Sequence, residues 1–331
     1  MRNTIDTLMQ GQLGEWLAGQ TEMRTAAKHK AASRWVWGAV VALPVLAFVW
    51  FGPDWGGGLK SFITIGAILG VSIWGYQPIA DAARAIKIGI NSAIAHSFGV
   101  AYEHDVEPGE EFAAARTYGL VPDFDRSNFE DRWYGTLESH AFNLYEAQLE
   151  ERRGSGKNQR WVTVFRGVIM QMGFGRSFHS TTLLQRAGRH RKWLGLGGAS
   201  DHVAFAGHRL DRVDQVHPAF GEVFALFSDD QVEARVLVHP SYVEHLLRLE
   251  SAFGAKELRA LFARGAVIIA VEGSDLFESG SIDASTDRAH AEKAAAQFSA
   301  LAGLALAINQ NERGRVLGSS TPPPVADRDQ A

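Results

Sequence analysis

The chain of 331 residues contains no cysteine. Disulfide bonds, thiolate zinc sites and cysteine nucleophiles are therefore excluded together. An excess of positive charge is also missing, because 33 lysines and arginines stand against 37 acidic residues and give a net charge of -4. Binding many phosphates requires a basic surface, so we expect no nucleic-acid partner.

Charged residues are absent from two stretches near the N-terminus, Trp35 to Pro53 and Ser61 to Ala80. Each stretch has about the ~20 residues that an α-helix needs to cross ~30 Å of hydrocarbon. The short glycine-rich segment DWGGGLK between them can reverse the chain. We predict a transmembrane helical hairpin over residues 34–80. The alternative is a hairpin buried in a soluble core, which is disfavoured because soluble helices of this length carry a polar face.

Basic residues gather beside the spans rather than between them: Arg24, Lys28, Lys30 and Arg34 precede the first, and Arg84 and Lys87 follow the second. By the positive-inside rule, both termini and the main domain are expected in the cytoplasm. The expected location is the bacterial inner membrane, with the lipid bilayer as a partner. We expect no cleaved signal peptide, because the first apolar stretch begins only at Trp35.

The remaining chain is predicted to fall into four parts. Residues 1–33 have apolar positions at helical spacing, as in an amphipathic helix. Residues 81–112 are predicted as a helical stalk, with Ile86, Ile90 and Ile94 on one stripe, followed by an acidic linker from Glu103 to Glu111. Residues 113–312 form a cytoplasmic domain, and residues 313–331 a disordered tail by composition.

The cytoplasmic domain is predicted to be α+β, with a mixed, mainly antiparallel sheet and packed helices. Three segments rich in β-branched and aromatic residues are expected as strands: Trp161 to Phe174, Phe220 to Phe227 and Ala266 to Gly273. The segment 141–149 fits strand or helix, and strand is favoured. Helices are predicted for Pro240 to Phe253 and for 287–309, the latter packing on the sheet.

A search for catalytic motifs finds none. GSGK at 154–157 lacks the spacing of a phosphate-binding loop and is interpreted as a turn between strands. The twelve histidines are scattered, and a metal site at His239 and His245 is disfavoured against ordinary surface histidines. We therefore predict no catalytic residue, no cofactor and no metal site.

One cluster of cations is a candidate contact for lipid headgroups. It comprises Arg186, Arg189, Arg191 and Lys192. Near an anionic bilayer each cation could contribute ~1 kcal/mol of attraction. The favoured alternative is a solvated loop between strands, in which case replacing all four cations leaves vesicle binding by the isolated domain unchanged.

Three sequence strings resemble a known bacterial family. FALFSDDQVEARVLVHPSYVEHLLRLE from Phe224, VFRGVIMQMGFGRSF from Val164 and GLVPDFD from Gly119 are similar to the domain-of-unknown-function family 3137, and the N-terminal spans also agree. The resemblance covers roughly residues 24–278 and departs from the family in VHPS, where leucine-threonine-proline is usual. It implies a membrane-anchored protein without an assigned activity, and it carries over no catalytic residue.

Within this resemblance, Asp229, Asp230, Glu233 and Arg235 are candidate interaction residues. The acidic residues form either a recognition edge or, as favoured, a turn and helix cap, with Arg235 available to pair with one of them. The leading functional hypothesis is a non-enzymatic binding or scaffold module, with a membrane-protein partner or self-association. The alternatives are a lipid or small-ligand binding domain with a pocket in its sheet and, less favoured, a membrane-bound hydrolase.

Overall fold

A computed structural model describes most of the chain. The described residues are 6–7, 9–52, 55–137, 139–175, 177–187, 200–205, 207–214, 218–238, 257–273 and 277–316. They divide into two compact units: Met1–Ser97 with Glu278–Ala295, and Phe98–Phe277 with Ala296–Ala331. The boundary falls within one long C-terminal helix, and the predicted helix of Pro240 to Phe253 lies outside the described residues.

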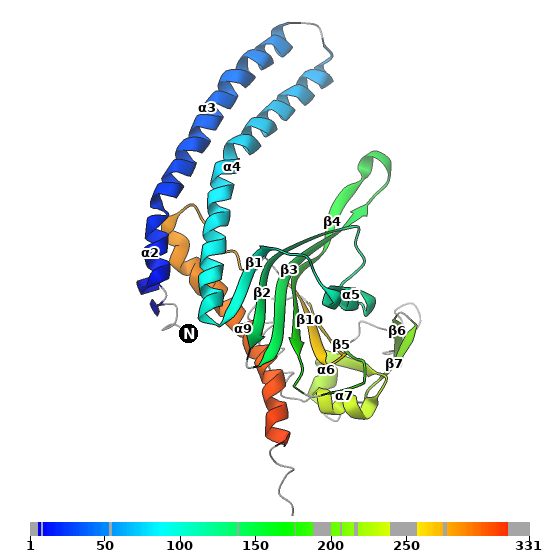
Figure 1. Cartoon of the computed structure of the whole chain (residues 1–331). Coiled ribbons are helices and arrows are strands. Elements are labelled where there is room, and N and C mark those ends of the chain that lie inside the picture. Colours follow the sequence, from blue (N-terminus) through cyan, green and yellow to red (C-terminus); the bar gives the residue numbers. More distant parts are fainter. Residues whose placement is uncertain are drawn as a thin grey trace, which may run out of the picture. The chain divides into compact units, whose positions relative to one another are not determined.

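The first unit is built around two long helices. Helix α2 (Gln12–Gly19) leads into α3 (Thr21–Phe51), and α4 (Gly57–Ser97) returns beside α3 (Figure 1). By length and composition alone, α3 and α4 could each cross a membrane. Helix α4 continues beyond the second apolar stretch, and Ile86, Ile90 and Ile94 on this continuation are completely buried.

The apolar part of this hairpin is not a buried core. In the most apolar windows of the two helices, 6% and 0% of the residues are buried. Phe51, Phe62 and Ile73 illustrate the pattern with exposures of 91%, 75% and 65%. A soluble helix would cover such side chains, since each buried large apolar side chain contributes about 1.5–3 kcal/mol. The structure is thus consistent with a transmembrane hairpin, which the sequence favours over a hairpin buried in a soluble core.

Glycines allow the two helices to approach closely. A Cβ atom added at Gly38 would lie 2.6 Å from Val71 Cγ1, and one at Gly75 would lie 1.9 Å from the Trp35 ring. Small residues at such positions are typical of packed membrane helices, where close backbone contact replaces the hydrophobic effect.

Polar contacts border the apolar segment at both ends. Arg34 donates from Nη1 to the Trp74 carbonyl (3.0 Å), and Trp50 donates from Nε1 to Thr64 Oγ1 (3.1 Å). Trp50 lies 16 positions after Arg34 in the same helix, which corresponds to a rise of about 24 Å. This length is close to the hydrocarbon thickness of a bilayer.

The C-terminal segment of the first unit contacts α3 and α4 outside their uncharged stretches. Arg24 donates from Nη2 to both carboxylate oxygens of Asp287 at 2.7 Å, with both side chains 5% exposed. Ser279 donates to Asn91 Oδ1 at 2.8 Å in a fully buried contact. Short helix η2 (Ala284–Thr286) is capped by Asp283 and leads into α9 (Asp287–Val316).

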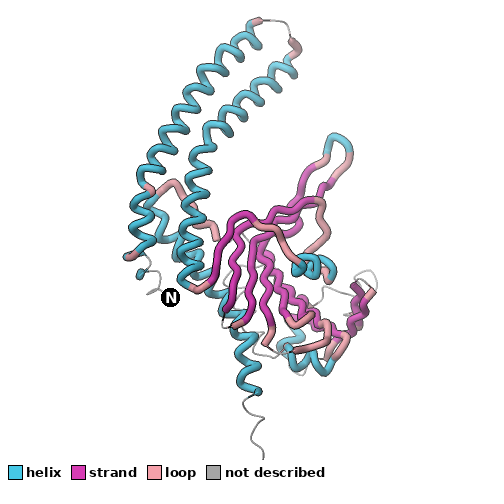
Figure 2. The backbone as a smooth tube through the Cα atoms, viewed as in Figure 1, coloured by secondary structure: helices cyan, strands magenta, loops and turns pink. Residues whose placement is uncertain are grey.

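The second unit contains one large sheet. Figure 2 shows its strands in magenta. Among the described residues ten strands pair in the order β1-β2-β3-β4-β10-β9-β5-β8-β7-β6. Their bounds are β1 Val100–Asp105, β2 Arg126–Leu137, β3 His140–Arg153, β4 Arg160–Gly173, β5 Thr182–Arg186, β6 His202–Phe205, β7 His208–Arg212, β8 Phe224–Ser228, β9 Glu257–Ala263 and β10 Ala266–Glu272. The helices are α5 Glu110–Thr117, η1 Gly156–Asn158, α6 Pro218–Val223, α7 Gln231–Leu237 and the later part of α9.

The α+β class is confirmed, but several details differ from the prediction. Every strand pair described is antiparallel, so the sheet is not mixed. The strand predicted from Phe220 begins only at Phe224, because Pro218 starts a helix instead. The predicted linker from Glu103 includes the end of β1 and the start of α5. Residues 313–316, assigned to the tail, are helical.

Both faces of the sheet are covered within the second unit. On one face α5 contributes Ala115 to a core that includes Tyr145 and Phe165. On the other, Phe298 of α9 stacks on Trp133 of β2 with ring centroids 4.7 Å apart. The prediction that the last helix packs on the sheet is confirmed by this contact.

Candidate ligand-binding pocket

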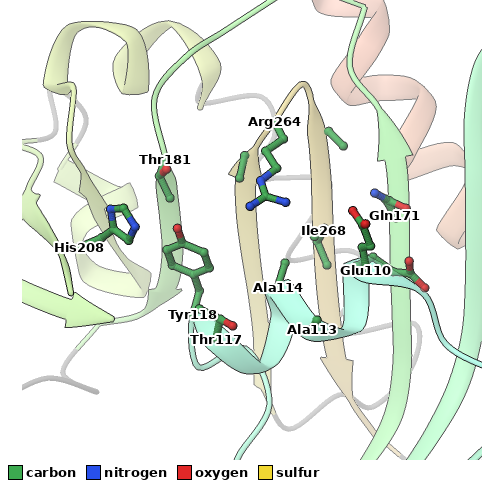
Figure 3. Close-up of a pocket in the computed structure, with 13 residues that line it drawn as sticks. Glu110, Ala113, Ala114, Thr117, Tyr118, Gln171, Thr181, His208, Arg264 and Ile268 are labelled. Atoms are coloured by element: carbon green, nitrogen blue, oxygen red, sulfur yellow. The ribbon is translucent and has the colours of Figure 1, made fainter. Parts of the chain in front are cut away.

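A hollow of about 540 Å³ lies between helix α5 and the sheet (Figure 3). Residues from α5, β4, β7, the β9–β10 hairpin and the segment before β5 form its walls. The lining residues are Glu110, Glu111, Ala113, Ala114, Thr117, Tyr118, Gln171, Thr181, His208, Ala263, Arg264, Ala266 and Ile268.

Helix α5 supplies one wall because its ends are strongly defined. Glu110 and Glu111 occupy its first turn, where acidic side chains complement the helix dipole. At the other end Gly119 has a φ of +66°, and Leu120 N donates to Ala115 O at 2.8 Å. Together with the bond from Gly119 N to Arg116 O (3.1 Å), this forms a Schellman motif. The motif ends the helix beside Tyr118 and thereby places its ring at the pocket.

Glu111 is a buried carboxylate at the base of this helix. Its Oε1 accepts hydrogen bonds from Gly109 N (2.9 Å) and Asn143 Nδ2 (3.2 Å), and Arg132 Nε in turn donates to Asn143 Oδ1 (2.9 Å). Burial raises the pKa of the neighbouring Tyr145, and the negative charge of Glu111 raises it further. The Tyr145 hydroxyl therefore stays protonated beside the carboxylate.

Arg264 brings positive charge to the opposite wall. Arg264 and Gly265 join β9 to β10 with φ values of +52° and +73°, while Ala263 pairs with Ala266. Two residues with positive φ between paired strands form a type I′ turn. Figure 3 shows the guanidinium of Arg264 extending from this turn over the hollow.

The arrangement combines an apolar floor with polar groups around it. Ala114, Ala266 and Ile268 offer aliphatic surface, while Arg264 and Tyr118 offer hydrogen-bond donors. A concave site with a few convergent polar groups is the usual form of a small-molecule pocket. Glu110 and Glu111 also line the hollow, so the site offers one guanidinium and two carboxylates around an aliphatic floor and suits a small ligand with an apolar body and a charged group.

The acidic residues predicted from the sequence lie at the turn before α7. Asp230 caps α7, since its Oδ1 accepts from Val232 N (2.9 Å) and Glu233 N (3.0 Å). Asp229 Oδ1 accepts from Thr181 N (2.8 Å), and Thr181 itself lines the pocket. These two carboxylates therefore form a turn and a helix cap, as the favoured interpretation of the sequence has it. The turn helps to position one pocket wall.

Glu233 fixes the same neighbouring segment. Its Oε2 accepts from Ser180 N (2.6 Å) and His179 N (3.0 Å). Burial alone would raise the pKa of Glu233, but these hydrogen bonds from Ser180 and His179 outweigh it and hold the pKa below its ordinary value. Arg235 donates from Nε to the Asp214 carbonyl (3.2 Å), a partner that the sequence did not indicate.

Of the predicted lipid-contact cluster, the structure describes only Arg186. Arg186 ends β5 with its guanidinium 5.3 Å from the centre of the Phe224 ring. Arg189, Arg191 and Lys192 lie outside the described residues, as do His239 and His245. Headgroup contact by this cluster stays a prediction.

Sequence reasoning missed Tyr118 and Arg264. The signal for Arg264 was present, because an Arg-Gly pair separates two apolar runs of strand length. Tyr118 precedes Gly119, a glycine at the position where helices commonly end. Neither signal indicates a pocket until the strand order brings the two segments together.

No curated protein matches the chain. A solved structure that is similar is the crystal structure of the mycobacterial trehalose monomycolate transport factor A, at 11% identity over 67% of this chain and 94% of that one, with a TM-score of 0.32. A likeness of this size carries no argument about function. Residues 163–310 match the family model described as "Protein of unknown function (DUF3137)", a range that begins later and ends later than the predicted one. Over these residues, the match confirms the resemblance to this family that was predicted from the SDDQVEAR segment.

Proposed function

We propose that the chain is a non-enzymatic binding module anchored in the bacterial inner membrane by α3 and α4. The observation that supports this most is the outward exposure of their apolar side chains, with almost no burial in the most apolar windows. Water would not tolerate two exposed surfaces of this size, whereas lipid would.

The proposed orientation places the sheet-containing unit in the cytoplasm. Lys28, Lys30 and Arg34 precede the first apolar segment, and Arg84 and Lys87 follow the second. Cations next to short connections favour the cytoplasmic side. The loop between α3 and α4 then lies on the opposite side of the membrane.

The pocket under α5 is the proposed binding site of this module. Arg264 is exposed on the turn between β9 and β10, so a ligand can reach its guanidinium without displacing the core. Arginine binds carboxylate or phosphate groups through paired hydrogen bonds. The aliphatic floor at Ile268 would hold the apolar part, which favours a small amphipathic anion such as a short-chain lipid phosphate.

Isothermal titration of the full-length protein in nanodiscs with dihexanoyl phosphatidic acid tests this proposal. Dihexanoyl phosphatidylcholine and inorganic phosphate serve as separate arms, which distinguish a lipid phosphate from a zwitterionic headgroup and from free phosphate. A hydrogen bond to a charged group contributes ~1.5–3 kcal/mol, so Arg264→Gln should weaken saturable binding about 10- to 100-fold.

Arg160→Gln provides the matched control, because Arg160 is exposed at the far end of β4 and does not line the pocket. It should bind the probe as the unaltered chain does. Equal affinities for Arg264→Gln and the unaltered chain, or no saturable binding of any arm, would contradict the assignment of the pocket.

A further inference from the structure

A cluster of metal-ligating side chains lies at the β1 edge of the sheet, away from the pocket. His104 Nδ1 is 3.1 Å from Asp131 Oδ1, and the Tyr102 hydroxyl donates to the same oxygen at 2.6 Å. Glu130 completes the group: one ligand atom from each of His104, Glu130 and Asp131 lies within 4.8 Å of the others. Two of these residues, Glu130 and Asp131, are adjacent in β2, and His104 comes from β1.

A β-bulge directs Asp131 into this cluster. The ladder between β2 and β3 is regular up to Glu130 and resumes at Trp133, so an extra residue is inserted between them. Asp131 has a φ of +58° and is completely buried. Bulges often re-aim side chains, and aspartate is one of the few residues that accept this backbone conformation.

The donor set and its spacing fit one metal ion. An imidazole nitrogen and two carboxylates are ligands of Zn²⁺, at distances of about 2.0–2.2 Å. Around a tetrahedral ion at that distance, ligand atoms stand roughly 3.4 Å apart, which is close to the 3.1 Å between His104 Nδ1 and Asp131 Oδ1. The Glu130 oxygen, which lies within 4.8 Å of both atoms, would close on the ion when it binds. We propose that His104, Glu130 and Asp131 bind one divalent transition-metal ion, with Zn²⁺ as the best fit.

The surroundings support a cation at this position. Glu146, only 7% exposed, stands directly opposite Glu130 in the β2–β3 ladder. A third carboxylate thus stands one strand away from the cluster, and a divalent cation bound there would be attracted by this negative charge. The absence of cysteine leaves nitrogen and oxygen donors as the chain's metal ligands.

Tyr102 would act as a positioning residue in this site. Its hydroxyl bonds Asp131 Oδ1, and its ring packs against the completely buried Trp133 with centroids 5.3 Å apart. Outer hydrogen bonds of this kind orient a metal-binding carboxylate, and losing one typically weakens metal affinity about 10- to 100-fold.

Metal analysis of the full-length protein, purified in detergent with a tag that lacks histidine, tests the proposal. After incubation with Zn²⁺ and dialysis against metal-free buffer, the unaltered chain should retain one equivalent by mass spectrometry of the metal. His104→Gln, Glu130→Gln and Asp131→Asn should each weaken Zn²⁺ binding at least ~10-fold. Tyr102→Phe should weaken it without abolishing it. Co²⁺ bound to the unaltered chain should show the visible absorption of a tetrahedral site, and the His104→Gln variant should not.

The control is His202→Gln, which removes an exposed histidine of β6 and should leave the retained metal unchanged. Asp131→Asn keeps a residue that tolerates positive φ, and His104→Gln leaves the bulge intact, so both variants should keep the fold. Their melting temperatures without metal show whether a loss of metal binding is instead a loss of fold. Retention of no Zn²⁺ by the unaltered chain, or equal retention by His104→Gln, would overturn the proposal and leave a hydrogen-bonded Tyr102–Asp131–His104 network only.

Discussion

Replacing Asp287 by alanine should release the start of α9 from the first unit. Both oxygens of Asp287 accept from Arg24 Nη2 at 2.7 Å, and both side chains are 5% exposed. Removing one partner of a buried ion pair costs ~3–5 kcal/mol, because the remaining charge stays buried without compensation. Hydrogen exchange of amides near residues 287–295 should therefore become about 10²- to 4 × 10³-fold faster where this contact limits local opening.

Hydrogen-exchange mass spectrometry of the full-length protein in nanodiscs measures this change. The double replacement Arg24→Met with Asp287→Leu should restore most of the protection, since an apolar pair of similar volume removes the buried charge altogether. Exchange that is less than about 10-fold faster in Asp287→Ala would refute the reasoning. So would a double variant as unprotected as the single one, because the two side chains would then not act as a pair.

Three further predictions concern the turn, the hairpin and the pocket wall. Asp230→Ala should lower the free energy of unfolding by about 1 kcal/mol through loss of the α7 cap, and an unchanged urea midpoint would contradict this. The pKa of Glu233 is lowered in the folded chain, so its ionised carboxylate stabilises the fold above the ordinary pKa of 4.5, and this stabilisation is lost as the pH falls through the lowered value. The difference in unfolding free energy between the unaltered chain and Glu233→Gln should therefore shrink on acidification. Gly38→Leu should weaken α3–α4 packing, measured as a lower melting temperature in detergent, whereas the unobstructed Gly66→Leu should have little effect.

Residue patterns predicted the longest helices and four of the ten described strands (β3, β4, β8 and β10), because each of these patterns reflects one physical requirement. The uncharged runs give the two long helices, and the β-branched runs give β4 and β10. The pattern failed at β1, where Glu103 and Asp105 suggested an acidic linker. In fact Val100, Tyr102 and His104 alternate with them at the spacing of a strand, and the polar positions are tolerated because β1 is the edge of the sheet.

The two proposed sites depend on strand pairing, which the sequence does not specify by itself. His104 and Asp131 are 27 residues apart and meet only through the β1–β2 register and one inserted residue. Arg264 and Tyr118 are separated by more of the chain and meet only because α5 lies over β10. By contrast, the cap at Asp230 is local and could be predicted, since its hydrogen bonds reach only two and three residues ahead.

The proposed topology can be measured directly because the chain has no cysteine of its own. Single cysteines at Gly57, beside the start of α4, and at Ser155, in the exposed β3–β4 turn, would be labelled in intact cells with a membrane-impermeant maleimide. Labelling of the Gly57→Cys chain from outside, with Ser155→Cys labelled only after lysis, is the predicted result. Equal labelling of both positions in intact cells, or recovery of the protein in the soluble fraction without detergent, would contradict the membrane anchor and its orientation.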